Sequence, residues 1–488
     1  MKKLLLILLS NLFIIQGYSQ DSLNLDFEQY DNTRATKLKG WLTSAPNFAI
    51  IDSINVFQGK YSLMLLSPGN SKSSVFSTRV NNENKPPYLI NISAQIKTEI
   101  GENGFTGFLI NVLDGKNTVS QDFMRSVRET GFKDWHNIST KMLITQPSTD
   151  IYFGGAFFGT GKAWFDNMTF RIITNPEISD TARRYLNDFF NIIETKSIMK
   201  DSVDFVNLKE RTFLYASGAE TTTDCYPALR YILDALHDNH SYILDPHKTL
   251  EKESSTFNSD NKNPLTTCQI INSERNFGYI SVPYWVSINP IESRLFADTL
   301  QNQIKRLDKK NIYGWIIDLR QNSGGNCWPM IAGLGPLIGE GIFGYFISTN
   351  PTSNQECYYN KGKVGHGKYE EISIPKPYRL KYKDKRIAVL IGPKTASSGE
   401  LVTISFIGKQ GTRLFGEPTA GLTSANSLTK LSDGATLWLT TSIDADRNLK
   451  KYGGKIIPDE NVPFNVTEYA IDDDPVVKAA INWLNKKN

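Results

Sequence analysis

The chain has 488 residues, of which 40% are hydrophobic and 21% charged, and its formal net charge at pH 7 is +4. Its length predicts two or three globular domains, and its slight charge, with no basic run interleaved with aromatics, argues against a nucleic-acid partner. After the first 20 residues, no segment approaches the ~20 apolar residues of a membrane span.

The chain begins with MKKLLLILLSNLFIIQGYSQ, in which two lysines precede an apolar stretch and then small and polar residues. This pattern is typical of a secretory signal peptide and is too short and wrongly flanked for a membrane-spanning helix. We expect residues 1–19 to be removed by cleavage after Ser19, and no cysteine lies there to carry a lipid. The sequence therefore predicts an exported protein, periplasmic or extracellular.

Residues 21–172 are predicted to form an all-β sandwich of the jelly-roll type. Short apolar and aromatic runs such as YLINISAQI and DIYFGGAFF recur, separated by Gly, Asn and Pro. The stretches NLDFEQYDN, GKYSLML and GKAWFDNMTF resemble those of secreted carbohydrate-binding modules. Two interpretations stay open, a scaffold without a sugar site and a glycan-binding module. Three tryptophans suit either stacking on a sugar or the core: Trp41, Trp135 and Trp164.

Residues 176–265 change to a helical pattern, since ISDTARRYLNDFFNIIETKSI and DCYPALRYILDALHDNH repeat apolar residues at helical spacing. From residue 268 to 488, apolar runs that suit buried strands alternate with amphipathic helices, which predicts a layered α/β core. The four cysteines fit no zinc pattern, and the sequence leaves disulfides and buried thiols equally open; they are Cys225, Cys268, Cys327 and Cys357.

The stretch IIDLRQNSGGNCWP places the pair Gly324 and Gly325 after a buried strand and before a helix. Glycines let the backbone approach a ligand closely, and amides at a helix start point outward. Such amides suit an oxyanion hole, and an ordinary strand-to-helix turn is the alternative explanation of the stretch.

The stretch GPKTASSGE sits where an apolar strand turns into a helix. At such a corner the hydroxyl of Ser397 is exposed like an elbow-mounted nucleophile, and the amide of Ser398 faces a developing oxyanion. Glu400 follows three residues later, so Ser397 and Glu400 also match a helix capping box. The motif alone fits both roles.

A serine nucleophile needs a base, and the chain has five histidines. His240 in LHDNHSYI follows a predicted helix end and precedes an apolar run, so it is placed to face a cleft. A cap or a surface residue is the alternative for a histidine at this position.

Taken in order, DLRQNSGG, TASSGE, FGEPTAGLT, LSDGATLWLTTS and GGKIIPDENV resemble the serine peptidase family of C-terminal-processing (tail-specific) proteases and the tricorn core. The resemblance covers roughly residues 180–470 and implies a crotonase-like α/β core with amide hydrolysis through an acyl-enzyme. The family's PDZ module does not fit between residues 243 and 267.

Carried over residue by residue, the resemblance implies Ser397 as nucleophile, with the amides of Ser398 and of Gly324 or, preferably, Gly325 as oxyanion donors. The lysine base of the processing branch is replaced by Leu422, whereas the aspartate-x-histidine turn of the tricorn-like branch places the base on His240. The third member stays open, with Glu400 placed first and three alternatives after it: Asp444, Asp446 and Asp459.

The sequence therefore predicts a multidomain, exported serine peptidase that acts on peptides or proteins and needs no metal or organic cofactor. Two alternatives remain: an inactive ligand-binding protein on the same fold, resembling retinoid-binding members, or a protein directed to glycans by its N-terminal module.

Overall fold

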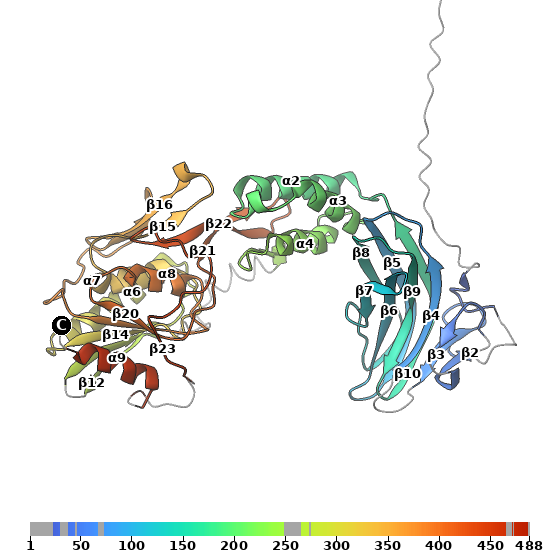
Figure 1. Ribbon diagram of the computed structural model, residues 1–488, viewed down its shortest axis with the longest axis horizontal. Coiled ribbons are helices and arrows are strands. Elements are labelled where there is room, and N and C mark those ends of the chain that lie inside the picture. Colours follow the sequence, from blue (N-terminus) through green and yellow to red (C-terminus); the bar gives the residue numbers. More distant parts are fainter. Residues whose placement is uncertain are drawn as a thin grey trace, which may run out of the picture. The chain divides into compact units, whose positions relative to one another are not determined.

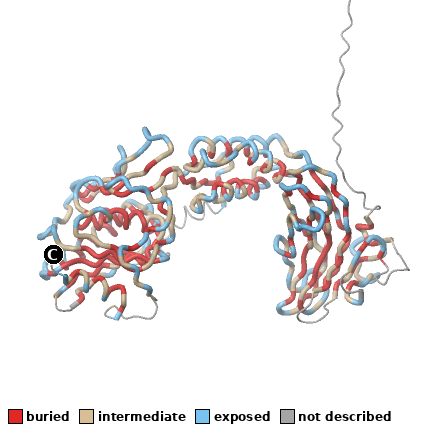
Figure 2. The backbone as a smooth tube through the Cα atoms, viewed as in Figure 1, coloured by how far each residue is buried: buried red, intermediate tan, exposed pale blue. Residues whose placement is uncertain are grey.

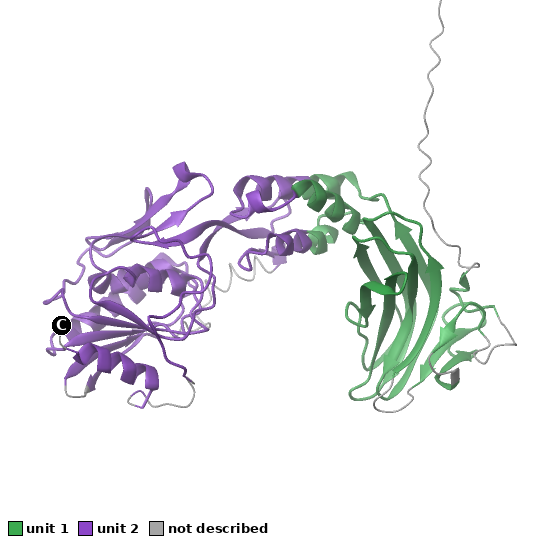
Figure 3. Cartoon of the chain, viewed as in Figure 1, with its two compact units in different colours: residues 1–186, 205–228 green, residues 187–204, 229–488 purple. Residues whose placement is uncertain are grey.

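The computed structural model describes residues 23–29, 38–43, 46–66, 73–247, 265–272, 275–464, 471 and 473–486. The predicted signal peptide, residues 1–19, lies outside these ranges. The chain divides into two compact units, residues 1–186 with 205–228 and residues 187–204 with 229–488 (Figure 3). Among the described residues, no helix is long and apolar enough to cross a membrane.

The first unit contains two five-stranded antiparallel sheets. One has the order β1 (Leu42–Thr43), β4 (Ser73–Asn81), β9 (Asp150–Phe158), β6 (Phe105–Asp114) and β7 (Asn117–Phe123). The other has the order β2 (Ala49–Asp52), β3 (Ser62–Leu66), β10 (Gly161–Ile173), β5 (Tyr88–Ile100) and β8 (Phe132–Ile144).

The two sheets share one apolar core. Residues of β5 alternate between buried and half-buried, as expected when one face of an antiparallel sheet packs inward. Phe76 of β4 meets Phe165 of β10 at a ring distance of 5.1 Å, and Phe153 of β9 stacks on Phe170 of β10 at 4.2 Å. The predicted β-sandwich is confirmed.

The three candidate sugar-stacking tryptophans differ in exposure. Trp41 and Trp164 are each 1% exposed, so their ring faces are not available to a sugar. Trp164 also donates its Nε1 hydrogen to Asp52 Oδ2 at 2.7 Å. Trp135 is half-buried and lies 5.9 Å from the ring of Phe57.

Helices occupy the predicted helical segment: α2 (Asp180–Lys196), α3 (Phe205–Tyr215) and α4 (Tyr226–Leu236). In the first unit, α3 packs on the sandwich because Leu214 is buried with Leu89 and Ile173. Short 3-10 helices are η1 (Pro46–Phe48), η2 (Lys200–Ser202), η3 (Thr223–Cys225) and η4 (Pro351–Ser353).

The second unit is built on a six-stranded sheet whose strands are parallel except for the first pair. Its order is β12 (Thr267–Asn272), β13 (Asn276–Ser281), β14 (Gly314–Asp318), β19 (Ile387–Ile391), β20 (Thr412–Gly416) and β23 (Glu460–Asn461). Every residue of β14 and β19 is buried, as expected for strands covered on both faces, and Figure 2 shows this buried centre.

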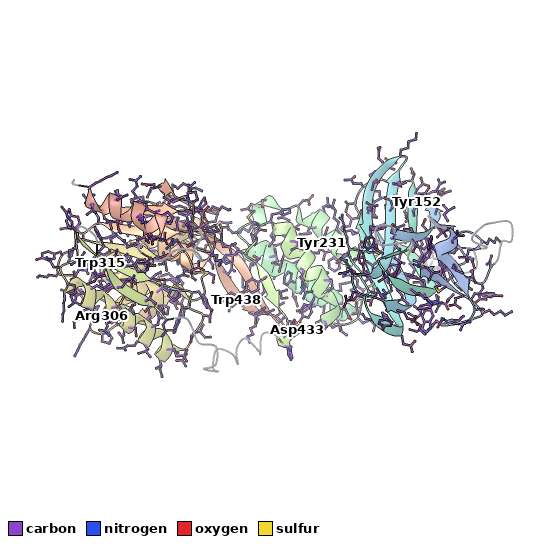
Figure 4. The ribbon with its side chains drawn as sticks, turned by 90° about the horizontal axis from the view of Figure 1, so that it is seen from below. Tyr152, Tyr231, Arg306, Trp315, Asp433 and Trp438 are labelled. Atoms are coloured by element: carbon purple, nitrogen blue, oxygen red, sulfur yellow. The ribbon has the colours of Figure 1, made fainter. Side chains whose placement is uncertain are left out.

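Helices cover the two faces of this sheet. Trp315 (labelled in Figure 4) and Ile317 pack with α6 (Pro290–Asp308), α7 (Cys327–Ile338) and α8 (Ser398–Phe406). Ile316 points the other way and packs against α9 (Pro475–Asn485), which lies on the opposite face in Figure 1. The predicted α/β core is confirmed.

A second, antiparallel sheet of the same unit has seven strands. Its order is β11 (Tyr242–Leu244), β22 (Thr436–Asp446), β15 (Gly341–Ile347), β16 (Gln355–Asn360), β17 (Lys363–His366) and β18 (Tyr369–Ser373), with β21 (Ser424–Lys430) also paired to β22. Because β22 pairs with both β11 and β21, it brings the segments around residues 240 and 424 together. All four cysteines are free thiols; three of them are buried, as one of the two interpretations expected, and Cys268 is half-buried.

Candidate active site

Two loops meet at one edge of the six-stranded sheet, where β14 and β19 end side by side. These strands are parallel, with Asp318 opposite Leu390, so the segments that follow them emerge together. Thr395 Oγ1 donates to the carbonyl of Leu319 at 2.9 Å, and Ala396 N donates to the carbonyl of Asn322 at 3.0 Å. The two glycine- and serine-rich stretches of the sequence are therefore fastened to each other.

Ser397 is the N-cap residue of α8 and has φ of 51° and ψ of −118°. A positive φ is unfavourable for a serine and is typical of elbows that hold a nucleophile outward. Gly324 lies against this turn: a Cβ on it would stand 2.8 Å from the carbonyl oxygen of Ala396 and 3.0 Å from Ser397 Cβ. Both the elbow and the glycine are thus fixed by close backbone contact.

His240 meets this serine, since its Nε2 lies 3.1 Å from Ser397 Oγ. The histidine follows α4 in a tight turn in which His237 and Asn239 have positive φ. Asp238 Oδ1 accepts the backbone N–H of His240 at 2.9 Å, and Asn426 Nδ2 donates to the His240 carbonyl at 2.9 Å. Burial lowers the pKa of His240, and the nearby Asp238 charge opposes this shift.

Ser424 occupies the other side of the imidazole, with its Oγ 2.9 Å from His240 Nδ1. For Nε2 to accept the Ser397 proton, Nδ1 must carry hydrogen, and Ser424 Oγ is placed to accept that hydrogen. The sequence analysis did not find Ser424. Its hydroxyl lies at the start of β21, and no motif distinguishes it from the other small polar residues of TAGLTSANS.

Glu400 is fully buried and is placed beside the nucleophile's main chain rather than beside His240. Its Oε2 accepts the N–H groups of Ser397 at 2.9 Å and Leu422 at 2.8 Å. Its Oε1 accepts the Gly421 N–H at 2.9 Å and the Thr419 hydroxyl at 2.5 Å. Burial raises the pKa of Glu400 and these four hydrogen bonds lower it. Glu400 therefore joins the elbow to the loop that follows β20, and the capping box is present as well.

Two of the other acids considered as third members are also engaged away from His240. Asp446 Oδ2 accepts the Tyr452 hydroxyl at 3.0 Å, and Asp459 Oδ2 accepts the Leu414 N–H at 2.7 Å. Among the described residues, no carboxylate forms a hydrogen bond or ion pair with His240. The group next to His240 Nδ1 is the neutral hydroxyl of Ser424.

The two glycines of the oxyanion stretch have different environments, although their φ values, 105° and 103°, both favour glycine. The N–H of Gly324 is used, since it donates to Asn322 Oδ1 at 3.0 Å. In the part of the chain that the structure describes, the N–H groups of Gly325 and Ser398 have no hydrogen-bond partner. Both residues line the cavity that contains Ser397 and His240. These two amides are therefore placed to receive an oxyanion.

The cavity has a volume of about 1180 Å³ and is lined by polar and apolar side chains. On one side Tyr242 and Trp438 (labelled in Figure 4) stack at a ring distance of 5.7 Å. Elsewhere its wall includes Trp328, Phe346 and Leu401. No cluster of three or more potential metal ligands occurs among the described residues.

The aspartate and arginine of DLRQNSGG form a buried ion-pair network. Arg320 Nη2 lies 2.6 Å from Asp318 Oδ2, and Arg320 Nη1 lies 2.7 Å from Asp474 Oδ2. The Tyr279 hydroxyl donates to Asp318 Oδ2 at 2.7 Å. This network anchors the start of the loop that carries Gly325. The role of these charged side chains is therefore structural rather than catalytic.

Comparison with known proteins agrees with this geometry. Residues 276–462 match the model of peptidase family S41. The chain carries a peptidase family S41 domain. This S41 domain makes the chain a serine-type peptidase, and the matched range includes the Gly325 loop, the Ser397 elbow and Ser424. His240 lies before the matched range.

Two named proteins are similar to part of this chain. The chain is 27% identical over 310 residues to the nisin-resistance protein of Lactococcus lactis subsp. lactis, covering 64% of this chain and 89% of that protein. It is 24% identical over 205 residues to the chloroplastic carboxyl-terminal-processing peptidase 2 of Arabidopsis thaliana, covering 36% of each. A solved structure of a lipoprotein from Streptococcus agalactiae shares the fold, with a TM-score of 0.50 and 22% identity over 64% of this chain and 99% of that one.

Proposed function

We propose that the protein is an exported serine peptidase that cleaves peptide bonds through an acyl-enzyme on Ser397, with His240 as the general base. The observation that carries this proposal is the 3.1 Å contact between His240 Nε2 and Ser397 Oγ inside the cavity. A hydroxyl becomes a useful nucleophile only when a base takes its proton, and this contact supplies the geometry for that transfer.

In the proposed reaction, Ser397 Oγ attacks the peptide carbonyl while His240 Nε2 takes the hydroxyl proton. The carbonyl oxygen becomes an oxyanion held by the N–H groups of Gly325 and Ser398. Neither of these N–H groups has a protein partner among the described residues. His240 then gives the proton to the leaving amine as the C–N bond breaks. A water molecule, deprotonated by the same histidine, releases the acyl group and restores Ser397.

The lowered pKa of His240 supports the role of base, because the imidazole is then neutral and able to accept a proton at neutral pH. Export rests on the N-terminal sequence pattern, and we propose mature residues from 20 onward. We also propose a division into a sandwich module of residues 21–172, a helical segment of residues 176–265 and a peptidase core of residues 268–488. Because one relative is a nisin-resistance protein, nisin is the first peptide to offer as a substrate.

The ligand-binding alternative requires a cavity in which the histidine points away from the serine. The contact between the two side chains favours the enzyme instead. For the sandwich, the burial of Trp41 and Trp164 leaves Trp135 as the candidate ring for a glycan.

The test is labelling of the purified mature protein with a fluorophosphonate probe, followed by mapping of the modified peptide. We expect labelling at Ser397 that is lost in Ser397→Ala and falls sharply in His240→Ala. His237→Asn is the matched control, since His237 lies outside the cavity and asparagine tolerates its positive φ. Labelling that survives His240→Ala would assign the base to another group, and no labelling of the wild type would reject the proposed activity.

A further inference from the structure

A second acid lies in the wall of the active-site cavity and has no role in the reaction just described. Asp444 on β22 lines the cavity and is 2% exposed. Its Oδ1 is buried and has no hydrogen-bond partner among the residues that the structure describes. Buried polar atoms are nearly always paired, because an unpaired carboxyl loses its hydration without compensation.

Among the described residues, no hydrogen bond or ion pair reaches the Asp444 carboxyl. The ionisable groups that feel its charge include the buried thiols of Cys327 and Cys357, which are at best weak donors, and the carboxyl of Glu400, which carries the same sign. Burial raises the pKa of Asp444 well above its usual value. A cation beside this carboxyl would favour its charged form.

Asp446, two residues further along the same strand, provides the contrast. It is also 2% exposed, but its carboxylate accepts the Tyr452 hydroxyl at 3.0 Å and the N–H groups of Asn448 and Lys450 at 2.8 and 3.1 Å. The fold thus satisfies one buried aspartate of β22 and leaves the other, the one in the cavity wall, without a partner.

Asp444 lines the same cavity as Ser397 and His240 and is linked to their surroundings in two ways. Its neighbour Ile443 pairs with Ser424, the residue whose hydroxyl meets His240. Its charge also acts on Cys327, which stands two residues after Gly325, one of the two proposed oxyanion donors. Asp444 and Gly325 therefore line the same cavity.

Aromatic side chains lie beside Asp444, and the His366 ring stacks on one of them, Trp328, at 5.2 Å. Phe346 is its direct cross-strand partner on β15, and the Phe346 ring lies 6.3 Å from the ring of Trp328. Leu401 lines the cavity as well. Apolar walls that end in a carboxyl suit the long methylene stem and charged head of lysine or arginine. A carboxylate at the base of such a pocket selects basic residues in other serine peptidases.

We propose that Asp444 binds the cationic side chain of a lysine or arginine residue whose carbonyl is attacked by Ser397. The substrate class is therefore a peptide that is basic at the residue before the cleaved bond. This inference rests on the proposed function, because it requires Ser397 as the nucleophile.

The test compares two diphenyl phosphonate probes that react with a serine nucleophile without needing a known substrate sequence. One probe carries the side chain of lysine, and the other carries that of norleucine, which has a similar stem without the charge. Wild type should react about 10- to 100-fold faster with the lysine probe, the ratio expected for a hydrogen-bonded charge. Asp444→Asn should reduce this ratio to about 1 to 3, because the amide keeps the shape and loses the charge.

Ser442→Ala is the matched control, since Ser442 lies on the same face of β22 and lines the same cavity. It should keep the wild-type ratio. Labelling by the small fluorophosphonate probe in all three proteins verifies that the site is folded and that Ser397 is active. With that labelling present, equal rates of the two phosphonates in wild type, a preference for norleucine, or a lysine preference that persists in Asp444→Asn would each overturn the inference. Absence of fluorophosphonate labelling in wild type would instead reject the proposed function.

Discussion

Replacing Ser424 with alanine removes the hydroxyl that lies 2.9 Å from His240 Nδ1 and leaves the Ser397 contact in place. Both Ser424 and His240 are half-buried, so water can reach the vacated position. A neutral hydrogen bond of this kind contributes about 0.5 to 1.5 kcal/mol. Since about 1.4 kcal/mol corresponds to a factor of ten in rate, we expect kcat/KM to fall roughly 2- to 12-fold.

The assay measures kcat/KM and KM on one peptide, together with the rate of fluorophosphonate labelling. The loss should appear in kcat and in labelling rate while KM is unchanged, because Ser424 orients the base and does not bind substrate. Ser427→Ala on the same strand is the control and should behave as wild type. A loss of about 10⁴-fold, the size reported by removal of a triad carboxylate, would refute the assignment of a neutral orienting group. Wild-type activity would show that the contact has no part in orienting His240.

Three further predictions follow from the geometry of the site. The acid limb of kcat/KM should have its midpoint below pH 6.5, because burial lowers the pKa of His240 from 6.5 and the imidazole therefore stays neutral to lower pH. A pH–rate profile with a midpoint above pH 7 would contradict this expectation. Glu400→Gln should lower the free energy of unfolding of the peptidase unit by about 1 to 3 kcal/mol, because the amide leaves at least one of three backbone donors unpaired. Urea unfolding, followed by the loss of fluorophosphonate labelling, measures this change in free energy. Gly325→Ala should abolish labelling, because its Cβ would stand 2.1 Å from the Trp285 carbonyl oxygen at a φ of 103°; labelling at the wild-type rate would refute the role of this loop.

The layered fold was predictable because local patterns determine it. Apolar runs such as IIDLR and IAVLI are typical of covered strands, and the structure confirms them as β14 and β19. Alternation along YLINISAQI likewise predicted a sandwich strand, which is β5. The contact between Ser397 and His240 joins residues 157 positions apart, and only the ordered motif set of a known family pointed to it.

The partner of Nδ1 was not predictable in the same way. Sequence reasoning searched for an acid, since triads usually contain one, and placed Glu400 first. The structure shows that the Glu400 carboxylate accepts four hydrogen bonds, three from backbone N–H groups and one from a hydroxyl, and none of these donors is His240. Which residue faces His240 depends on the register of β21 against β22, where Ser424 pairs with Ile443. That register is a property of the assembled sheet and leaves no signature in a serine surrounded by other small polar residues.

The ion pair between Arg320 and Asp474 has a consequence for shortened forms of the chain. Asp474 is the N-cap of α9 and also the partner that holds Arg320 Nη1 at 2.7 Å, so the loop that carries Gly325 is tied to a helix far from it in the sequence. A chain cut before residue 474 keeps the serine and the histidine but loses one anchor of the loop beside them. Possession of the nucleophile and the base is therefore not enough to make such a fragment a complete hydrolase.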